Sequence, residues 1–454
     1  MKQFEIWVEK FASLAWGPWL LILLTGGGLF FLLYSRFIPF RYFKHALHIL
    51  SGKYNNPNDP GDLTHFQALS SALAGTVGMG NISGVAIAIY TAGPGAIFWM
   101  WVSAIVGMAT KFFTASLAVM YRGRDTAGHL QGGPMYVIVE ALGQRWKPLA
   151  VWFSLAALIG CLPAFQANQL VQVFRELVFI PNGWLGVDHF WFNFITGTVI
   201  ALLVSSVILG GIHRIGQVTA RLVPAMVVLY FGAALWTLLT HWQQIPAMFE
   251  LIIADAFSGK AVAGGVLWTV VITGIRRAAF SNEAGLGTEA MAHGAAKTNE
   301  PIREGLVAMI GPFIDTIVVC TTTALMILIT GVWQQGIANG VTLTALAFDK
   351  AFPEFGVWVL IIAVLFFSLS TMFSYSYYGT KALGFLIGAH RQHYYNYFYI
   401  ALIVVSAVVS LDVVVNVIDG MYALMAIPTM TSALILAPRV MTAARNYFTR
   451  MQLR

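Results

Sequence analysis

The residues best suited to bind a ligand lie between Ala74 and Gly84, in the sequence Ala-Gly-Thr-Val-Gly-Met-Gly-Asn-Ile-Ser-Gly. Four glycines interrupt an apolar run here, although each costs about 1 kcal/mol relative to alanine in a helix interior. An unwound backbone at membrane depth is tolerated only where its N–H and C=O groups are buried in protein or line a polar cavity. The stretch therefore predicts either a broken helix that holds a ligand or ion, or close helix packing by small residues.

The elements that must position this stretch are membrane helices. The chain has 454 residues, of which 58% are apolar and 10% charged, and its mean hydropathy is +0.74. This composition lies outside that of soluble domains. No small-residue cleavage site follows the N-terminal segment, so we expect no removable signal peptide. The sequence predicts an all-α polytopic membrane protein that forms one bundle.

Hydropathy predicts eleven transmembrane helices, because many stretches reach the ~20 apolar residues that cross a bilayer. The predicted spans are Leu14–Leu33, Phe66–Tyr90, Ala96–Met120, Pro148–Phe174, Trp191–Gly210, Leu222–His241, Val262–His293, Leu306–Val332, Phe355–Tyr378, Tyr395–Ser410 and Val414–Ala437.

The basic residues give an independent test of this topology, because they are enriched in cytoplasmic loops. One set of alternate loops contains most of them, whereas the opposite set contains few, among them Lys2, Lys10, Lys260 and Lys350. This pattern predicts an external N-terminus and a cytoplasmic C-terminus. The net charge of +7 is then a topology signal, and no nucleic-acid partner is expected. The rich loops contain Arg36, Arg41, Lys44, Lys53, Arg122, Arg124, Arg145, Lys147, Arg214, Arg221, Lys297, Arg303, Lys381, Arg391, Arg439, Arg445, Arg450 and Arg454.

The seventh span is the other irregular one, with predicted interruptions at Thr273–Arg277 and Glu283–Gly287. Its Gly-Leu-Gly-Thr at 285–288 shares a Gly-x-Gly-polar pattern with Gly78–Asn81. Spans two and seven run in opposite directions on the predicted topology, as expected for inverted repeats. We predict one transporter domain over residues 1–454: an N-terminal extra helix and loop (1–60), two inverted five-helix repeats (61–245 and 246–438) with two broken helices, and a cytoplasmic tail (439–454).

The chemistry of two broken helices suggests the ligand. Half-helix N-termini present free N–H groups and partial positive charge, which suit a carboxylate, and freed carbonyls suit a cation. A zwitterionic amino acid with a coupling sodium ion satisfies both. No nucleophile elbow, phosphate loop or pair of catalytic carboxylates occurs in the sequence, so we predict neither an enzyme nor an organic cofactor. The expected partners are a small neutral amino acid, Na⁺ or H⁺ and the lipid bilayer, without an obligate protein partner.

Several motifs resemble a known family. Gly78-Met79-Gly80-Asn81, the segment from Ala92 to Trp101, Gly132–Tyr136 and Phe280–Thr288 resemble the signatures of the alanine or glycine:cation symporters. The resemblance implies a leucine-transporter type fold whose ten core helices begin with the second span. It also implies sodium-coupled, or less often proton-coupled, uptake of small neutral amino acids across a bacterial-type inner membrane.

The candidate substrate residues fall in three spans. Backbone N–H groups near Gly78 and Gly80 would bind the carboxylate, because glycine permits close approach. Thr76 and Asn81 belong to the same break, and Asn81 could instead bind the ion or hold the break together. Gln166 could bind substrate or connect helices. The full set is Thr76, Gly78, Gly80, Asn81, Phe165, Gln166, Thr273, Gly274 and Ile275.

The candidate sodium ligands are the hydroxyls of Ser368, Ser370 and Thr371 with the carbonyls of Ala74 and Val77. This pairing follows from the related fold, and oxygen-only coordination suits a hard cation. Alternatively, the hydroxyls bond only to the preceding turn of their own helix.

Charges at membrane depth are costly and usually paired. We expect Arg276 or Arg277 to pair with Glu283 or Asp315 in a structural or gating role, and the other arginine to face the cytoplasmic vestibule. We also expect structural pairing, in preference to a proton relay, for the other charges deep in the spans, which are Lys111, Asp315 and Asp419. The alternatives left open are a membrane-embedded enzyme, or a transporter for a different small zwitterion or an anion.

Overall fold

The computed structural model describes residues 2–186, 188–257, 266–336 and 339–452. The predicted beginning of the seventh span at Val262 and the loop residue Lys260 lie outside these ranges.

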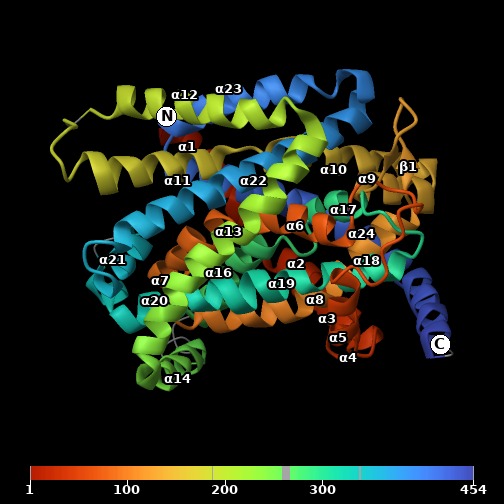
Figure 1. The fold of residues 1–454 in the computed structure, drawn as a ribbon, viewed down its shortest axis with the longest axis horizontal. Coiled ribbons are helices and arrows are strands. Elements are labelled where there is room, and N and C mark those ends of the chain that lie inside the picture. Colours follow the sequence, from red (N-terminus) through yellow and green to blue (C-terminus); the bar gives the residue numbers. More distant parts are fainter. Residues whose placement is uncertain (1, 187, 258–265, 337–338, 453–454) are drawn as a thin grey trace.

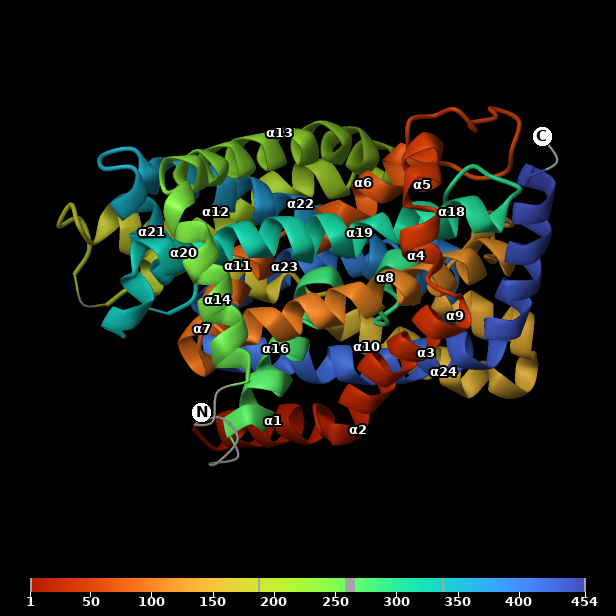
Figure 2. The same ribbon diagram turned by 90° about the horizontal axis from the view of Figure 1, so that it is seen from below.

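Most helices run along the long axis of the molecule, which is horizontal in Figures 1 and 2, and the two termini lie toward opposite ends of that axis. In the first half of the chain the elements are α1 (Lys2–Ala15), α2 (Pro18–Leu21), η1 (Ile22–Gly26), α3 (Gly27–Tyr34), α4 (Ile38–Arg41), α5 (Phe43–Leu50), α6 (His65–Thr76), η2 (Gly80–Gly84), α7 (Val85–Ala92), α8 (Ala96–Met120), β1 (Gly123–Arg124), β2 (Leu130–Gln131), α9 (Pro134–Val137), η3 (Ile138–Leu142), η4 (Gln144–Trp146), α10 (Lys147–Gly160), α11 (Ala164–Phe174), η5 (Arg175–Phe179), α12 (Phe190–Ile208) and α13 (Gly211–Thr240).

The second half is also helical. Its elements are η6 (Trp242–Gln244), α14 (Ile245–Ala256), α16 (Val266–Asn282), α17 (Thr288–His293), α18 (Pro301–Ala308), α19 (Ile310–Pro312), η7 (Phe313–Cys320), α20 (Thr321–Thr330), η8 (Val332–Gln335), α21 (Val341–Ala351), α22 (Gly356–Ile387), η9 (Ala389–Arg391), α23 (Tyr394–Val408) and α24 (Leu411–Gln452).

Seven helical segments in the described ranges are long and apolar enough to cross a membrane, and up to nine are if each of two bent helix pairs is one span. One bent pair joins α1 to the helices up to Tyr34, and the other joins α6 to the helices up to Ala92. The predicted seventh and tenth spans correspond to α16, with 17 residues, and α23, with 15. Both are shorter than the ~20 residues that cross a bilayer. The predicted count of eleven stays a prediction.

The predicted break in the second span is present. Thr64 begins α6 with a capping box, in which its hydroxyl accepts from the Gln67 N–H and the Gln67 side chain accepts from the Thr64 N–H. The helix ends at Thr76, because Val77 has φ −74° and ψ 89°, and resumes at Gly80 with a bend of 52°.

The seventh span is broken once in the described residues. α16 is continuous through Thr273–Arg277, so the interruption predicted there is wrong. The predicted interruption at 283–287 is present, because Glu283, Gly285 and Gly287 have φ of 55°, 86° and 90°. Such angles end a helix, and glycine adopts them at little steric cost.

The two broken spans run in opposite directions, α6 to α7 against α16 to α17 (Figure 1). The start of α6 lies beside the end of α17, where Leu63 forms an isolated bridge with Ala296 and its carbonyl accepts from the Lys297 N–H at 2.5 Å. α8 packs against α16 and α18, and α22 packs against α6, α10 and α13. This arrangement places both breaks in the buried interior; the inverted repeat itself stays a prediction.

Candidate functional site

Asn81 holds the first break in its shape. Its Oδ1 accepts from the Gly78 N–H at 2.8 Å, and its own N–H donates to the Gly78 carbonyl at 3.1 Å. Its Nδ2 donates to Asp315 Oδ1 at 2.7 Å and to the Asp315 carbonyl at 3.0 Å. Of the roles considered for Asn81, holding the break together is the one that these bonds describe.

The break releases the Ala74 carbonyl from its helical hydrogen bond. In an unbroken helix the Gly78 N–H would bond to the Ala74 carbonyl, but here it donates to Asn81 instead. Gly78 is so close to α22 that a Cβ on it would collide with Thr371 Oγ1. One turn earlier, the buried hydroxyl of Ser368 has no hydrogen-bond partner among the described residues. The Thr371 hydroxyl of α22 thus lies against the break, and the turn before it carries an unsatisfied hydroxyl.

The other predicted hydroxyl lies differently. Ser370 Oγ donates to the Phe367 carbonyl at 3.0 Å and lies 3.5 Å from Met226 Sδ of α13. Thr371 Oγ1 also donates to Phe367, at 3.0 Å, as considered in the alternative interpretation of these hydroxyls. Thr371 nevertheless contacts the break, whereas Ser370 is directed toward α13.

The second break is organised around Glu283, whose side chain is fully buried. Its carboxylate accepts hydrogen bonds from Thr288, at the start of α17, and from Tyr375 of α22. Tyr375 also bonds to Tyr422 of α24. Because α22 contacts Gly78 through Thr371 and Glu283 through Tyr375, one turn further on, a single helix connects the two breaks.

The breaks also meet directly. A Cβ on Gly80 would lie 3.2 Å from both Phe280 Cδ1 and Ser281 Cα, at the end of α16. Ser281 Oγ donates to Asp315 Oδ2 at 2.8 Å, and Asp315 Oδ1 accepts from Asn81. Asp315 thus receives hydrogen bonds from both broken spans.

Two residues of the fourth span lie near the second broken span. The ring of Phe165 stands edge-on to that of Phe280, with centroids 4.9 Å apart and planes at 81°. Gln166 is 4% exposed, and its Oε1 has no hydrogen-bond partner among the described residues. Phe165 thus lies against the residue that touches Gly80, and Gln166 retains an unsatisfied acceptor.

Thr273, Gly274 and Ile275 do not lie in a break. A Cβ on Gly274 would come within 2.5 Å of the Ala96 carbonyl and 2.6 Å of Trp99 Cβ, both on α8. The glycine therefore serves close packing of α16 against α8, which explains why it does not interrupt the helix.

The predicted partners of the two arginines are wrong. Arg276 and Arg277 both bind Asp419 of α24, Arg276 through Nη2 at 2.6 Å, instead of Glu283 or Asp315. The Asp419 carbonyl accepts from Trp16 Nε1 at 2.8 Å, which attaches the N-terminal helices to the same place. The adjacent arginines reach one carboxylate because their long side chains converge from neighbouring positions. Asp419 Oδ1 and Arg277 Nη1 remain buried without partners.

Polar contacts connect α6, α17 and α18 at the end of the molecule where α6 begins. The buried carboxylate of Glu304 on α18 binds His65 of α6 and His293 of α17, the latter at 2.5 Å. Beside it, Arg122 donates to the carbonyls of Gly294 and Ala296. Burial lowers the pKa of Arg122, against the attraction of Glu304 and Asp62, which raises it. The ends of both broken spans are thereby fixed together.

Sequence reasoning missed the central roles of Glu283, Tyr375 and Tyr422. Glu283 was considered only as a partner for arginine, and tyrosines in apolar helices give no signal of their own. The sequence predicts Asp315 as a paired charge or a partner of an arginine, and does not indicate that both breaks donate to it. The signal available for Glu283 was its place among Gly285 and Gly287, where a helix was already expected to end.

The overall fold is shared with a solved transporter. The crystal structure of MhsT in complex with L-phenylalanine aligns with a TM-score of 0.57 and 14% identity, over 85% of this chain and 99% of that one. The likeness shows a shared fold, in which this chain has two broken helices that run antiparallel.

The family follows from the sequence comparisons. The chain belongs to the sodium:alanine symporter family, which it matches over residues 1–454. It is 40% identical to the sodium/alanine symporter AgcS of Methanococcus maripaludis, over 97% of this chain and 96% of that one. It is 31% identical to the probable sodium/glutamine symporter GlnT of Bacillus subtilis, over 96% and 89% of the two chains. The chain is thus an amino acid symporter.

Proposed function

We propose that this protein couples sodium entry to the uptake of alanine and glycine by alternating access. The observation that carries the proposal is the meeting of two antiparallel broken spans at Asp315, with the Thr371 hydroxyl of α22 against Gly78 in the first break. The similarity to the sodium/alanine symporter AgcS supports the substrate class and the ion.

For the substrate, the first break supplies the N–H groups. Gly80 is the first residue of η2, and the first N–H groups of a helix have no partner in the preceding turn and suit a carboxylate. The Asn81 N–H already donates to the Gly78 carbonyl, so the Gly80 N–H is the donor proposed here. The Gly78 N–H is already used by Asn81, so Gly78 provides room instead of a donor. The substrate's side chain would pack against Phe165 and Phe280. Its amino group would donate to Gln166 Oε1, which has no partner among the described residues.

For the cation, we propose the carbonyls of Ala74 and Val77 with the hydroxyls of Thr371 and Ser368. Their fit is supported by the release of the Ala74 carbonyl from its helical bond and by the unpartnered Ser368 hydroxyl. Four oxygens from two helices suit a hard cation such as sodium. Because the ligands come from α6 and α22, a bound ion would stabilise the state in which these helices are together.

Uptake into proteoliposomes tests the function. Labelled alanine and glycine should accumulate with an inward sodium gradient and not with a potassium gradient of equal size. A proton gradient without sodium should give no accumulation, and labelled glutamine tests the substrate of the relative GlnT. If no neutral amino acid accumulates in response to an ion gradient, symport is refuted. If glutamine accumulates and alanine does not, the assigned substrate is refuted.

We further propose that the protein lies in the cell membrane, with its N-terminus outside and its C-terminus in the cytoplasm. Single cysteines at the two ends, in a variant without Cys161 and Cys320, should react with an impermeant maleimide on intact cells only at the N-terminus. Reaction at the C-terminus alone would invert the topology.

A further inference from the structure

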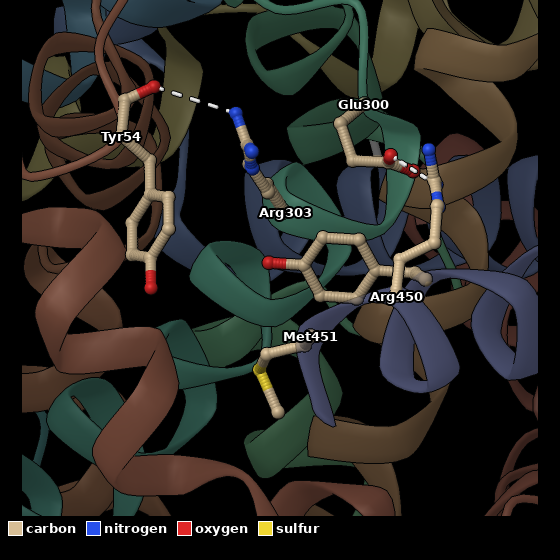
Figure 3. A pocket seen from close by; sticks show the side chains of 6 residues that line it. Tyr54, Glu300, Arg303, Arg450 and Met451 are labelled. Carbon is tan, nitrogen blue, oxygen red and sulfur yellow. Dashed lines mark hydrogen bonds and ion pairs between the residues drawn. The ribbon is translucent and has the colours of Figure 1, made fainter. Parts of the chain in front are cut away.

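A pocket of about 300 Å³ lies where the loop after α5, the start of α18 and the end of α24 meet (Figure 3). The end of α24, which supplies part of its wall, lies at the end of the long axis at which the C-terminus lies (Figure 2). The residues that line it are Tyr54, Glu300, Arg303, Tyr447, Arg450 and Met451.

The guanidinium of Arg303 lines this pocket and has an N–H group that can donate a further hydrogen bond. Its Nη1 donates to the Tyr54 carbonyl at 3.5 Å, and its Cζ lies 4.9 Å from the centre of the Tyr54 ring (Figure 3). Its Nε is buried and has no hydrogen-bond partner in the part of the chain that the structure describes. A buried guanidinium N–H without an acceptor is costly, and phosphate oxygens are acceptors that match its geometry.

The charges around the pocket favour an anion. Arg450 also lines it, and the acid among the lining residues, Glu300, is already paired with Arg450 at 2.6 Å. His45 bonds to Tyr447 OH at 2.7 Å, and its pKa is lowered by burial, then by the positive charges of His48, Arg303 and Lys53. The pocket therefore has a positive surplus that a bound anion would neutralise.

The neighbouring surface is suited to the membrane interface. The segment Arg36–Leu50 exposes Phe37, Phe40 and Leu47 beside basic side chains, a pattern typical of helices that lie at the headgroup level. The same segment contacts the pocket wall, because Tyr42 stacks on Phe448 of α24 at 3.7 Å between centroids. The apolar surface and the basic pocket thus adjoin each other.

We propose that this pocket binds the phosphate headgroup of an anionic phospholipid, whose acyl chains lie along the exposed aromatic side chains of Arg36–Leu50. Basic pockets between membrane helices are known to accept such headgroups. The lipid would connect α5, α18 and the end of α24, and α18 carries Glu304, which binds both broken spans. Lipid occupancy would therefore stabilise the closed end of the transporter.

The test measures the thermal unfolding of the purified full chain in detergent, with phosphatidylglycerol, phosphatidylcholine or inorganic phosphate added. Phosphatidylglycerol should raise the wild-type midpoint by several degrees, and neither other addition should. Arg303→Gln should lose at least half of this shift, whereas Arg391→Gln, a matched charge removal at an exposed site, should retain it. Glu300→Gln should enlarge the shift, because it removes the competing acid and releases Arg450.

Two results would overturn the proposal. An equal phosphatidylglycerol shift in wild type, Arg303→Gln and Glu300→Gln would place the lipid elsewhere. An equal shift with inorganic phosphate alone would make the pocket a site for a soluble anion. If Arg303→Gln does not fold, the enlarged or unchanged shift of Glu300→Gln still decides between these outcomes.

Discussion

Replacing Gly78 by alanine tests whether the closeness of α6 to α22 is required for substrate binding. Gly78 is not among the residues with positive φ, so its backbone angles are open to alanine. The obstacle is Thr371 Oγ1. A Cβ at position 78 would lie much closer to this oxygen than the ordinary van der Waals contact distance of 3.4–4 Å. Because Thr371 belongs to α22, relief requires that its side chain rotate, which breaks its bond to the Phe367 carbonyl, or that the two helices separate.

The size of the effect follows from this overlap. Inserting a methyl group into a packed interior costs about 1–3 kcal/mol. If the cost falls on the closed, ligand-bound state, alanine affinity drops by about 5- to 160-fold, at 1.36 kcal/mol for each factor of ten. The bound state loses population to states in which α6 and α22 are apart.

Gly84→Ala is the matched control, because outside its own helix no atom of the described residues lies within 4 Å of a Cβ built on Gly84, and its φ and ψ of −64° and −40° are helical. It should bind alanine like the wild type, with a stability gain of at most about 1 kcal/mol. The assay is sodium-dependent binding of labelled alanine to purified protein. Equal affinities of Gly78→Ala and Gly84→Ala would show that the contact with Thr371 is not needed for binding.

Three further predictions concern single side chains. Thr371→Ala should raise the sodium concentration for half-maximal uptake at least several-fold, whereas Ser376→Ala, whose hydroxyl bonds to its own helix, should leave it unchanged in the same uptake titration. Asp419→Asn should destabilise the protein by about 3–5 kcal/mol, because it leaves two arginines without their carboxylate. Arg276→Gln changes a side chain that is 21% exposed, so it should lower the stability clearly less than Asp419→Asn when both are measured by thermal unfolding. An equal loss of stability would contradict the pairing. Asn81→Ala should cost about 1–3 kcal/mol and abolish alanine binding, which unchanged binding would contradict.

Much of the framework could be predicted from the sequence because its signals are local. Apolar stretches determine which segments are helical, and the glycines at 75–84 mark a break that the structure contains. In the seventh span the same reasoning succeeded at Gly285 and Gly287, where positive φ is required. It failed at Gly274, because a glycine that permits close packing and one that ends a helix look alike in the sequence.

The partners of buried charges could not be predicted, because they depend on which helices become neighbours. Arg276 and Arg277 are 143 and 142 residues from Asp419, and nothing near either arginine indicates α24 as its neighbour. Likewise, Ser370 and Thr371 are adjacent hydroxyls in one apolar helix, and only packing shows that Ser370 lies near Met226 while Thr371 contacts Gly78.

The carboxylate at position 315 explains why the two breaks can be held together at membrane depth. Asn81 and Ser281 come from different broken spans, and each presents a donor to it, at 2.7 Å and 2.8 Å. Thr316 adds a third donor at 2.7 Å. An ionised carboxyl group accepts at both oxygens, whereas an amide would turn its own NH₂ toward one of these donors. A carboxylate therefore accepts from both broken spans at once, whereas an amide would require the hydroxyls of Ser281 and Thr316 to turn and accept instead, and this shared acceptor connects the two spans beside their breaks.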